Sequence, residues 1–77
     1  MINKNITDKT TQCKLILEYM QSHGSITPLD ALHEIGCLRL SARILDLRKL
    51  GWNIRTITVR QNGKKFARYI LEGENNG

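Results

Sequence analysis

Cysteine and histidine are the residue types in this chain that most often hold a metal ion. Cys13, His23, His33 and Cys37 follow a C-x9-H-x9-H-x3-C spacing. Structural zinc sites place their ligands in close pairs on one turn, which preorganises two ligands at a time. Only His33 and Cys37 are so close, and a helix is expected to end between them at Gly36. We therefore expect no metal site, and we assign both cysteines to packed positions as reduced thiols.

The histidines could act as general bases, and Ser25, Ser41 or Cys13 could act as nucleophiles. No predicted element brings an acid, a base and a nucleophile together, and the chain contains no glycine-rich phosphate loop. A chain of 77 residues forms one domain with a modest core and no room for a water-excluding cleft. No apolar run reaches membrane-spanning length. We therefore expect a protein that is not an enzyme and has neither a cofactor nor a membrane partner.

Basic residues are concentrated in one part of the chain. Residues 39–68 hold nine lysines and arginines and one acid, a formal charge of +8, whereas the other residues sum to −3 and the whole chain to +5. Segregated positive charge creates a strong local potential, and nucleic acid is the commonest polyanion in a cell. With one Phe and two Tyr, the chain offers little stacking platform for RNA. The distribution favours double-stranded DNA as the partner.

Apolar periodicity predicts three helices. The first begins at residue 10 or 11, repeats apolar residues at helical spacing and ends at Gly24. Thr27 and Pro28 predict the N-cap and first position of a short second helix that ends at Gly36. Its expected inward residues are Leu29, Leu32 and Ile35. The third helix is predicted over residues 40–50, with Gly51 after it, and its buried stripe is Leu40, Ile44 and Leu47.

A hairpin is predicted after the third helix. Residues 54–60 are rich in β-branched side chains, Asn62-Gly63 is a strong two-residue turn motif, and residues 65–71 form the returning strand. This turn pairs Arg60 with Lys65, and it turns one face of the hairpin toward the helices. The opposite face gathers Ile57, Val59, Phe66 and Ile70. Three explanations fit this apolar strip: cover by the N-terminal arm, a self-association or partner surface, or a register shift or bulge near the turn.

Three helices followed by a two-stranded β-hairpin wing define an α+β fold of the winged helix-turn-helix type. In this layout the third helix fits the DNA major groove, and the wing reaches phosphates or the minor groove. We assign the start of the third helix to base edges and the other basic side chains to phosphates. The candidate DNA-binding residues are Arg39, Ser41, Ala42, Arg43, Arg48, Lys49, Arg60, Lys64 and Lys65.

Some of these side chains have two interpretations. Arg43 either donates to guanine or forms a structural ion pair with Asp30 or Glu34. Asp46 either accepts from cytosine or, as we favour, pairs with Arg43 or Lys49. In the packing around these residues, we expect Trp52 to lie between the third helix and the wing. Leu15 and Tyr19, off the main stripe of the first helix, would mark a homodimer contact.

Three segments of the chain resemble the small helix-turn-helix domain proteins of bacteriophages and prophages. They are SITPLDA at 25–31, LSARILDLRKLGWNI at 40–54 and YIL at 69–71, and the likeness spans residues 12–71 with an ARIxxLRxxG motif at its centre. The resemblance implies a winged-helix DNA-binding fold and a regulatory role in transcription or recombination, in the cytoplasm and nucleoid of an infected bacterium. In compact helix-turn-helix units, a small residue in the first helix is followed by a glycine four residues later. Here Ala31 and Gly36 are five residues apart, so we expect a lengthened turn between the second and third helices.

The predicted organisation is a flexible arm at 1–9, a winged-helix domain at 10–72 and a disordered tail at 73–77. Our leading hypothesis is a duplex DNA-binding regulator of a phage or prophage. The alternative is a winged-helix interaction module that binds a host protein, suggested by the apolar strip beside the basic residues. A gel shift with random duplex DNA at low salt separates the two, and the DNA-binding hypothesis also predicts that affinity falls steeply with salt.

Overall fold

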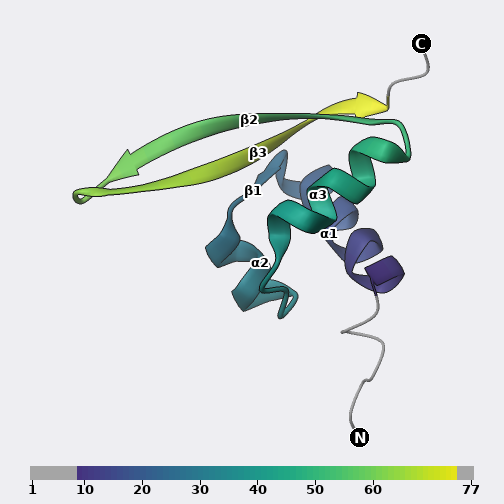
Figure 1. The fold of residues 1–77 in the computed structure, drawn as a ribbon, viewed down its shortest axis with the longest axis horizontal. Helices are drawn as coiled ribbons and strands as arrows, with labels where there is room; N and C mark the ends of the chain where they lie inside the picture. The colour runs from purple at the N-terminus through teal and green to yellow at the C-terminus, as the bar shows by residue number, and fades with distance from the viewer. Residues whose placement is uncertain (1–8, 75–77) are drawn as a thin grey trace, which may run out of the picture.

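The computed structural model describes residues 9–74, with the side chain of Glu74 excluded. In this part of the chain, three helices pack against a three-stranded antiparallel sheet whose hairpin extends well past them (Figure 1). The elements are α1 (Lys9–His23), β1 (Ser25–Ile26), α2 (Pro28–Glu34), α3 (Leu40–Lys49), β2 (Trp52–Gln61) and β3 (Lys64–Glu74). The predicted winged helix-turn-helix fold is confirmed.

Helices α1 and α3 bury the apolar stripes that their periodicity predicts. The buried residues of α1 are Cys13, Ile16 and Met20, and those of α3 are Leu40, Ile44 and Leu47. The two helices pack against each other, and α3 also packs on β2. Gly51 follows α3 with a φ of 105°, a left-handed conformation that glycine adopts without steric cost. This turn sends the chain directly from α3 into the hairpin.

The start of α2 is confirmed; of its predicted inward residues, Ile35 is buried as expected, but Leu29 and Leu32 are not. Thr27 and Asp30 form a capping box, in which the Asp30 N–H donates to Thr27 Oγ1 (3.2 Å) and the Thr27 N–H donates to Asp30 Oδ2 (3.1 Å). Leu29 is 62% exposed and Leu32 is exposed as well, while Ala31 is completely buried. Ala31 and Ile35 lie one helical turn apart, so they share the inward side and rotate both leucines outward.

The turn between α2 and α3 is long, as the spacing of Ala31 and Gly36 predicts. Five residues, 35–39, separate the two helices. The Cys37 N–H donates to the Ala31 carbonyl at 3.0 Å, and the Gly36 N–H donates to the Leu32 carbonyl at 3.1 Å. These bonds satisfy carbonyls at the end of α2 and bury Cys37 beneath the turn. The position of α3 relative to α2 therefore depends on this segment.

The predicted hairpin register is confirmed. Arg60 pairs with Lys65, Thr58 with Ala67, Thr56 with Tyr69, and Ile54 with Leu71. Asn62 and Gly63 both have positive φ, 52° and 76°, as a type I′ turn requires. The sheet also contains a short strand that the sequence analysis did not predict. Strand β1 pairs with β3 through Ser25↔Ile70 and Ile26↔Tyr69, which gives the order β1-β3-β2.

The outer face of the hairpin carries the apolar strip in the arrangement expected from the register. Ile57 is 37% exposed, and Val59, Phe66 and Ile70 are half-buried. The one irregularity between β2 and β3 lies at Asn53/Ile54, far from the turn. A register shift or bulge near the turn is therefore the wrong explanation for the strip. The N-terminal arm, which offered another explanation, falls almost wholly outside the described residues.

Several side chains around the core settle predictions made from the sequence. Trp52 packs against the core as expected, next to the end of α3. Leu15 and Tyr19, predicted at a dimer contact, are half-buried and pack against the same core. Strand β3 continues to Glu74, two residues beyond the predicted domain end, because β2 pairs with it as far as Trp52↔Glu74. Of the predicted arm at 1–9, Lys9 begins α1, and residues 1–8 lie outside the described residues, as do residues 75–77 of the predicted tail at 73–77. No helix within residues 9–74 has the length and hydropathy needed to cross a membrane.

Truncating Ile44 should destabilise the domain strongly. Ile44 is completely buried in the stripe by which α3 contacts α1 and the sheet. We expect Ile44→Ala to lower the free energy of unfolding by about 3 kcal/mol, through lost burial and a residual cavity. Leu45→Ala, on the exposed side of the same helix, should cost less than about 0.5 kcal/mol. Urea titration followed by circular dichroism measures both; equal losses would contradict the assignment of the buried stripe.

Candidate nucleic-acid interface

Helix α3 presents one side to solvent. Ser41, Leu45 and Lys49 are exposed, and they lie at successive four-residue intervals along the helix. Ala42 lies beside them and is half-buried. Small side chains at the start of the helix let its backbone approach a partner closely. This row is the part of α3 that another molecule can contact.

Leu45 was not among the residues predicted from the sequence, yet it lies at the centre of this row. Its side chain is 51% exposed. The sequence does contain the information, because Leu45 stands four residues from both Ser41 and Lys49 and off the stripe of Leu40, Ile44 and Leu47. An exposed leucine in the major groove can contact the methyl group of thymine, a recognised form of base discrimination.

Arg43 lies on another side of α3 and is engaged in an ion pair. Its Nε is 2.9 Å from Asp46 Oδ2, one turn away, and its side chain is only 11% exposed. Its backbone carbonyl accepts a hydrogen bond from the Cys13 thiol at 3.9 Å, which places this side of α3 against α1. The predicted pairing of Asp46 with Arg43 is thus confirmed. Within residues 9–74, the structure pairs Arg43 with neither of the other proposed acids, Glu34 and Asp30, and Asp30 is used in the capping box.

Arg48 is also held by the fold. Its Nε and one terminal nitrogen donate to the Ile54 carbonyl at 3.1 and 2.7 Å, and the same terminal nitrogen lies 2.9 Å from Thr56 Oγ1. The guanidinium therefore joins the last turn of α3 to the first part of β2. This contact fixes the angle between the helix and the wing, a role that the sequence analysis did not assign to Arg48.

The register of the hairpin determines which cations at its tip lie on the α3 side. Arg60 and Lys65 are paired and share a face with Thr56. Because Arg48 of α3 reaches Thr56, this is the face on which α3 packs. Lys64 is next to Lys65 in β3, and successive side chains of a strand point to opposite faces, so Lys64 lies on the other face of the hairpin. Arg60 and Lys65 thus continue the α3 side of the molecule outward, and Lys64 does not.

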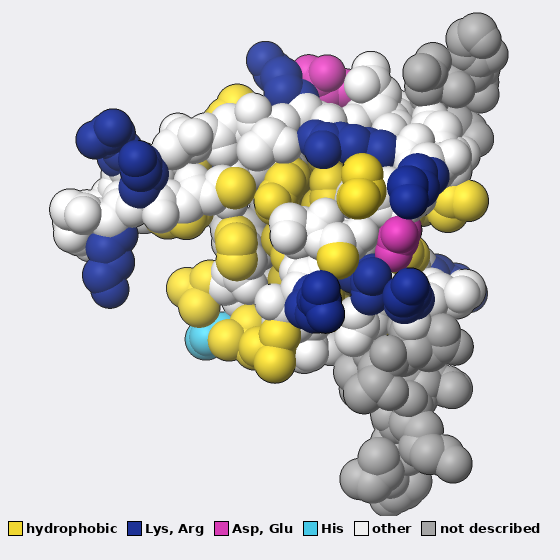
Figure 2. All heavy atoms as spheres, in the orientation of Figure 1, with side chains coloured by type: hydrophobic (Ala, Val, Ile, Leu, Met, Phe, Trp, Pro, Cys, Tyr) yellow, Lys and Arg dark blue, Asp and Glu magenta, His cyan; other side chains and the backbone are white. Residues whose placement is uncertain are grey.

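Figure 2 shows dark-blue Lys and Arg side chains on one face of the molecule, at the hairpin tip on the left and around α3 on the right, with apolar side chains between them. Of the nine candidate residues, six lie on the exposed row of α3 or beside it, at its N-cap, or on the α3 face of the wing. They are Arg39, Ser41, Ala42, Lys49, Arg60 and Lys65. Arg39 is the exposed N-cap of α3. The remaining three have other environments: the Asp46 ion pair for Arg43, the β2 contact for Arg48 and the opposite hairpin face for Lys64.

The two cysteines are buried, and His23 contacts an aromatic side chain of its own helix. Cys13 and Cys37 are free and buried, and His23 stacks on Tyr19 with ring centroids 4.1 Å apart. Within residues 9–74, no three His, Cys, Asp or Glu side chains come together as metal ligands would. Burial raises the pKa of the Cys13 thiol above its usual value, and the nearby Asp46 carboxylate raises it further.

Comparison with known proteins places this geometry in a family. The family model described as winged helix-turn-helix domain matches residues 11–74, so the chain belongs to that family. The match extends from the first turns of α1 to the end of β3. The fold is generally a DNA-binding one and typically non-catalytic. No significant match was found among curated proteins or among solved structures.

Removing the Arg48 guanidinium should loosen the wing rather than act only on binding. We expect Arg48→Gln to lower the free energy of unfolding by about 1 kcal/mol, because hydrogen bonds to Ile54 and Thr56 are lost at a partly solvated site. Lys49→Gln removes the same charge from an exposed neighbour and should leave stability nearly unchanged. Thermal unfolding compares the two variants; equal effects would show that the Arg48 contacts contribute no stability.

The Cys13 thiol should be unreactive in the folded protein. Its raised pKa keeps it protonated at pH 8, and burial blocks access of a reagent. Iodoacetamide at pH 8 should therefore modify Cys13 slowly without denaturant and rapidly in urea, as followed by mass spectrometry. Rapid modification of the folded chain would contradict the buried, protonated state.

Proposed function

We propose that this protein is a sequence-reading regulator that binds double-stranded DNA through α3 and the hairpin wing. The solvent row of α3 enters the major groove, with Ser41, Ala42 and Leu45 next to base edges. Arg39 and Lys49, near the two ends of the helix, neutralise flanking phosphates. Arg60 and Lys65 on the wing contact a neighbouring phosphate or the minor groove.

The observation that carries this proposal is that α3 and the wing cations lie on the same side of the sheet. Arg60 and Lys65 lie on the hairpin face to which Arg48 ties α3. The wing cations therefore extend beyond α3 on the side that carries this helix, and the exposed row of α3 is open to a partner there. A duplex is wide enough to contact a helix in its groove and a projecting hairpin at once, whereas a small ligand is not.

Charge supports the same conclusion. Helix α3 contains a single acidic residue, Asp46, and its carboxylate is paired with Arg43. It therefore does not oppose the approach of phosphates to the exposed row. Each phosphate that a cation neutralises releases counterions, so affinity should fall steeply as salt rises.

The regulatory setting that we propose is that of a phage or prophage protein acting in the cytoplasm of its bacterial host, on transcription or recombination. Its support is the ARIxxLRxxG motif of residues 42–51, which spans the exposed part of α3 and the glycine that leads into the wing. A homodimer would double the contacts that a single domain of this size makes with an operator.

Removing the wing cations should weaken binding to every duplex alike. For the double variant Arg60→Ala and Lys65→Ala, we expect the slope of log affinity against log salt to flatten by about 2, roughly one per lost phosphate contact. Fluorescence anisotropy with a random-sequence duplex at several salt concentrations measures this slope. Arg55→Ala is the control: Arg55 is exposed and pairs with Glu72 on the opposite face of the hairpin, so losing its charge should leave the slope nearly unchanged.

Changing the α3 row should instead alter sequence preference. Selection from a random duplex pool should give different consensus sites for the parent and for Leu45→Gln or Ser41→Ala, with a preference worth about 1–3 kcal/mol at a contacted base pair. Identical consensus sites would remove α3 from the base-reading role. No shift of random duplex DNA at low salt would favour the alternative function, a module that binds a host protein.

A further inference from the structure

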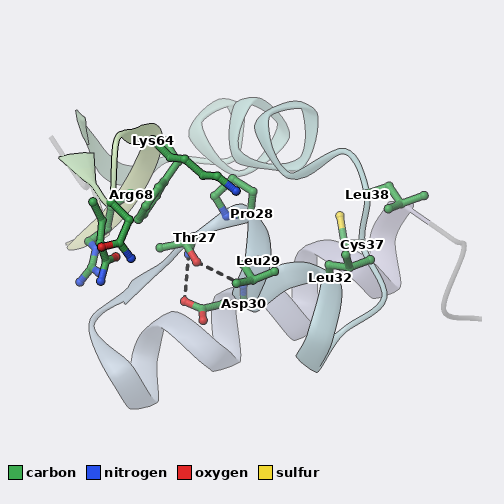
Figure 3. Close-up of a pocket in the computed structure, with 12 residues that line it drawn as sticks. Thr27, Pro28, Leu29, Asp30, Leu32, Cys37, Leu38, Lys64 and Arg68 are labelled. Atoms are coloured by element: carbon green, nitrogen blue, oxygen red, sulfur yellow. Dashed lines mark hydrogen bonds between the residues drawn. The ribbon is translucent and has the colours of Figure 1, made fainter. Parts of the chain in front are cut away.

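A groove lies between α2 and the hairpin, apart from the exposed row of α3. Its volume is about 690 Å³. Figure 2 shows it as a notch below the projecting hairpin, and Figure 3 shows its lining. One wall comes from α2 and the following turn, with Leu29, Leu32 and Leu38; the other comes from β3, with Lys64, Phe66 and Arg68.

The wall formed by α2 and its following turn exposes large apolar side chains that the fold leaves uncovered. Leu29 is 62% exposed, Leu32 is 44% exposed and Leu38 is 81% exposed. Leu29 and Leu32 are the α2 residues that the sequence predicted to be buried, and Leu38 belongs to the turn after α2. Three exposed leucines around one hollow form an apolar surface of the kind that marks a protein-binding site.

The β3 wall supplies positive charge. Figure 3 shows Lys64 extending across toward Pro28, with Arg68 at one end of the groove and Leu38 at the other. The Arg68 Nε is buried and has no hydrogen-bond partner in the described part of the chain. Asp30 also lines the groove, but its carboxylate already accepts the Thr27 N–H. The groove is thus cationic at one end, where a buried donor lacks an acceptor, and apolar at the other.

The β3 wall is also an open strand edge. Within residues 9–74, strand β1 pairs with β3 only at Tyr69 and Ile70, so residues 64–68 have no ladder partner on that side in this part of the chain. The Leu71 N–H donates to Gly24 at 3.0 Å on the β1 side, and the alternation of an antiparallel strand turns the backbone groups of Ala67 and Lys65 the same way. These groups face the space that α2 borders, because α2 directly follows β1 in the chain.

We propose that this groove binds an extended segment of a partner protein, which adds a strand to β3 beside Lys65 and Ala67. The segment carries an acidic residue near Lys64 and Arg68 and apolar residues over Leu29, Leu32 and Leu38. Backbone pairing at a strand edge supplies affinity, and the pockets that alternate side chains enter supply specificity. The acidic residue would pair with the positive charges of Lys64 and of the Arg68 guanidinium, both of which line the groove.

Duplex DNA is a poorer occupant of the groove than a protein segment. A phosphate backbone is polar along its whole length, and it would leave the three leucines without an apolar partner. The proposed segment thus adds a protein partner to a DNA-binding domain, through a surface that the α3 row does not share.

The probe for this proposal is a displayed library of random twelve-residue peptides, selected on the full-length protein. Selected sequences should alternate apolar residues and carry Asp or Glu at one end. A synthetic copy of the enriched sequence, labelled for fluorescence anisotropy, should lose about tenfold in affinity with Leu38→Ser or Leu29→Ser. Arg68→Gln should cause a similar loss. Amide resonances of Lys65 and Ala67 should shift most when the peptide is added.

Leu50→Ser is the matched control, because it also replaces an exposed leucine but lies at the end of α3, away from the groove. It should bind the peptide as the parent does. Circular dichroism verifies that every variant is folded. Failure to enrich any sequence, or peptide binding that Leu38→Ser leaves unchanged, would overturn the proposal.

Duplex binding is measured on the same variants, so that this inference and the DNA-binding function can fail separately. Leu29→Ser and Leu38→Ser should retain the DNA affinity of the parent. If they lose DNA affinity and keep peptide affinity, the groove belongs to the duplex surface and the proposed protein site is overturned. If only the Arg60→Ala and Lys65→Ala double variant loses DNA binding, the conclusion about the peptide site does not change.

Discussion

The burial of one stripe of α3 is the constraint on which the other features depend. Ile44 and Leu47 are almost completely buried between α1 and the sheet, and Leu40 closes the same stripe. Once this side is inside, the helix has no rotational freedom, and every other residue takes a fixed direction. Ser41, Leu45 and Lys49 must face solvent, Arg43 must face α1, and Arg48 must face β2. The exposed chemistry of α3 is therefore a consequence of its packing.

The second constraint is the register of the hairpin, which a two-residue turn sets. Asn62 and Gly63 accept the positive φ angles that a type I′ turn needs, and a shift of one residue would exchange the two faces. The register sends Arg60 and Lys65 to the face that carries α3. The same register sends Phe66 and Arg68 to the other face, where they border the groove at α2. One turn thus divides the basic residues of the wing between two surfaces.

The sequence predicted the elements that repeat over several turns or residue pairs, and it failed where one contact decides the outcome. The periodicity of α1 and α3, the cap at Thr27 and the hairpin pairing all follow local rules. In α2, seven residues contain too few turns for a pattern, and the burial of Ala31 rotated Leu29 and Leu32 outward. The role of Arg48 depends on the Ile54 carbonyl in β2, and the residue pattern of α3 carries no information about a contact with another element. The same applies to the pairing of β1 with β3, a contact between segments more than forty residues apart. For the candidate site, charge and layout predicted the elements, while the choice among their side chains required the packing.

The short first strand has a consequence for how copies of this chain behave at high concentration. An uncovered strand edge is a template on which molecules can stack into sheets, and evolved proteins commonly oppose such stacking with charged residues, lysine above all. Lys64 and Lys65 stand at the end of the uncovered stretch of β3, so two copies meeting edge to edge would bring like charges together. The hairpin cations therefore protect the chain from fibrous aggregation, and that protection weakens as ions in the solvent screen them.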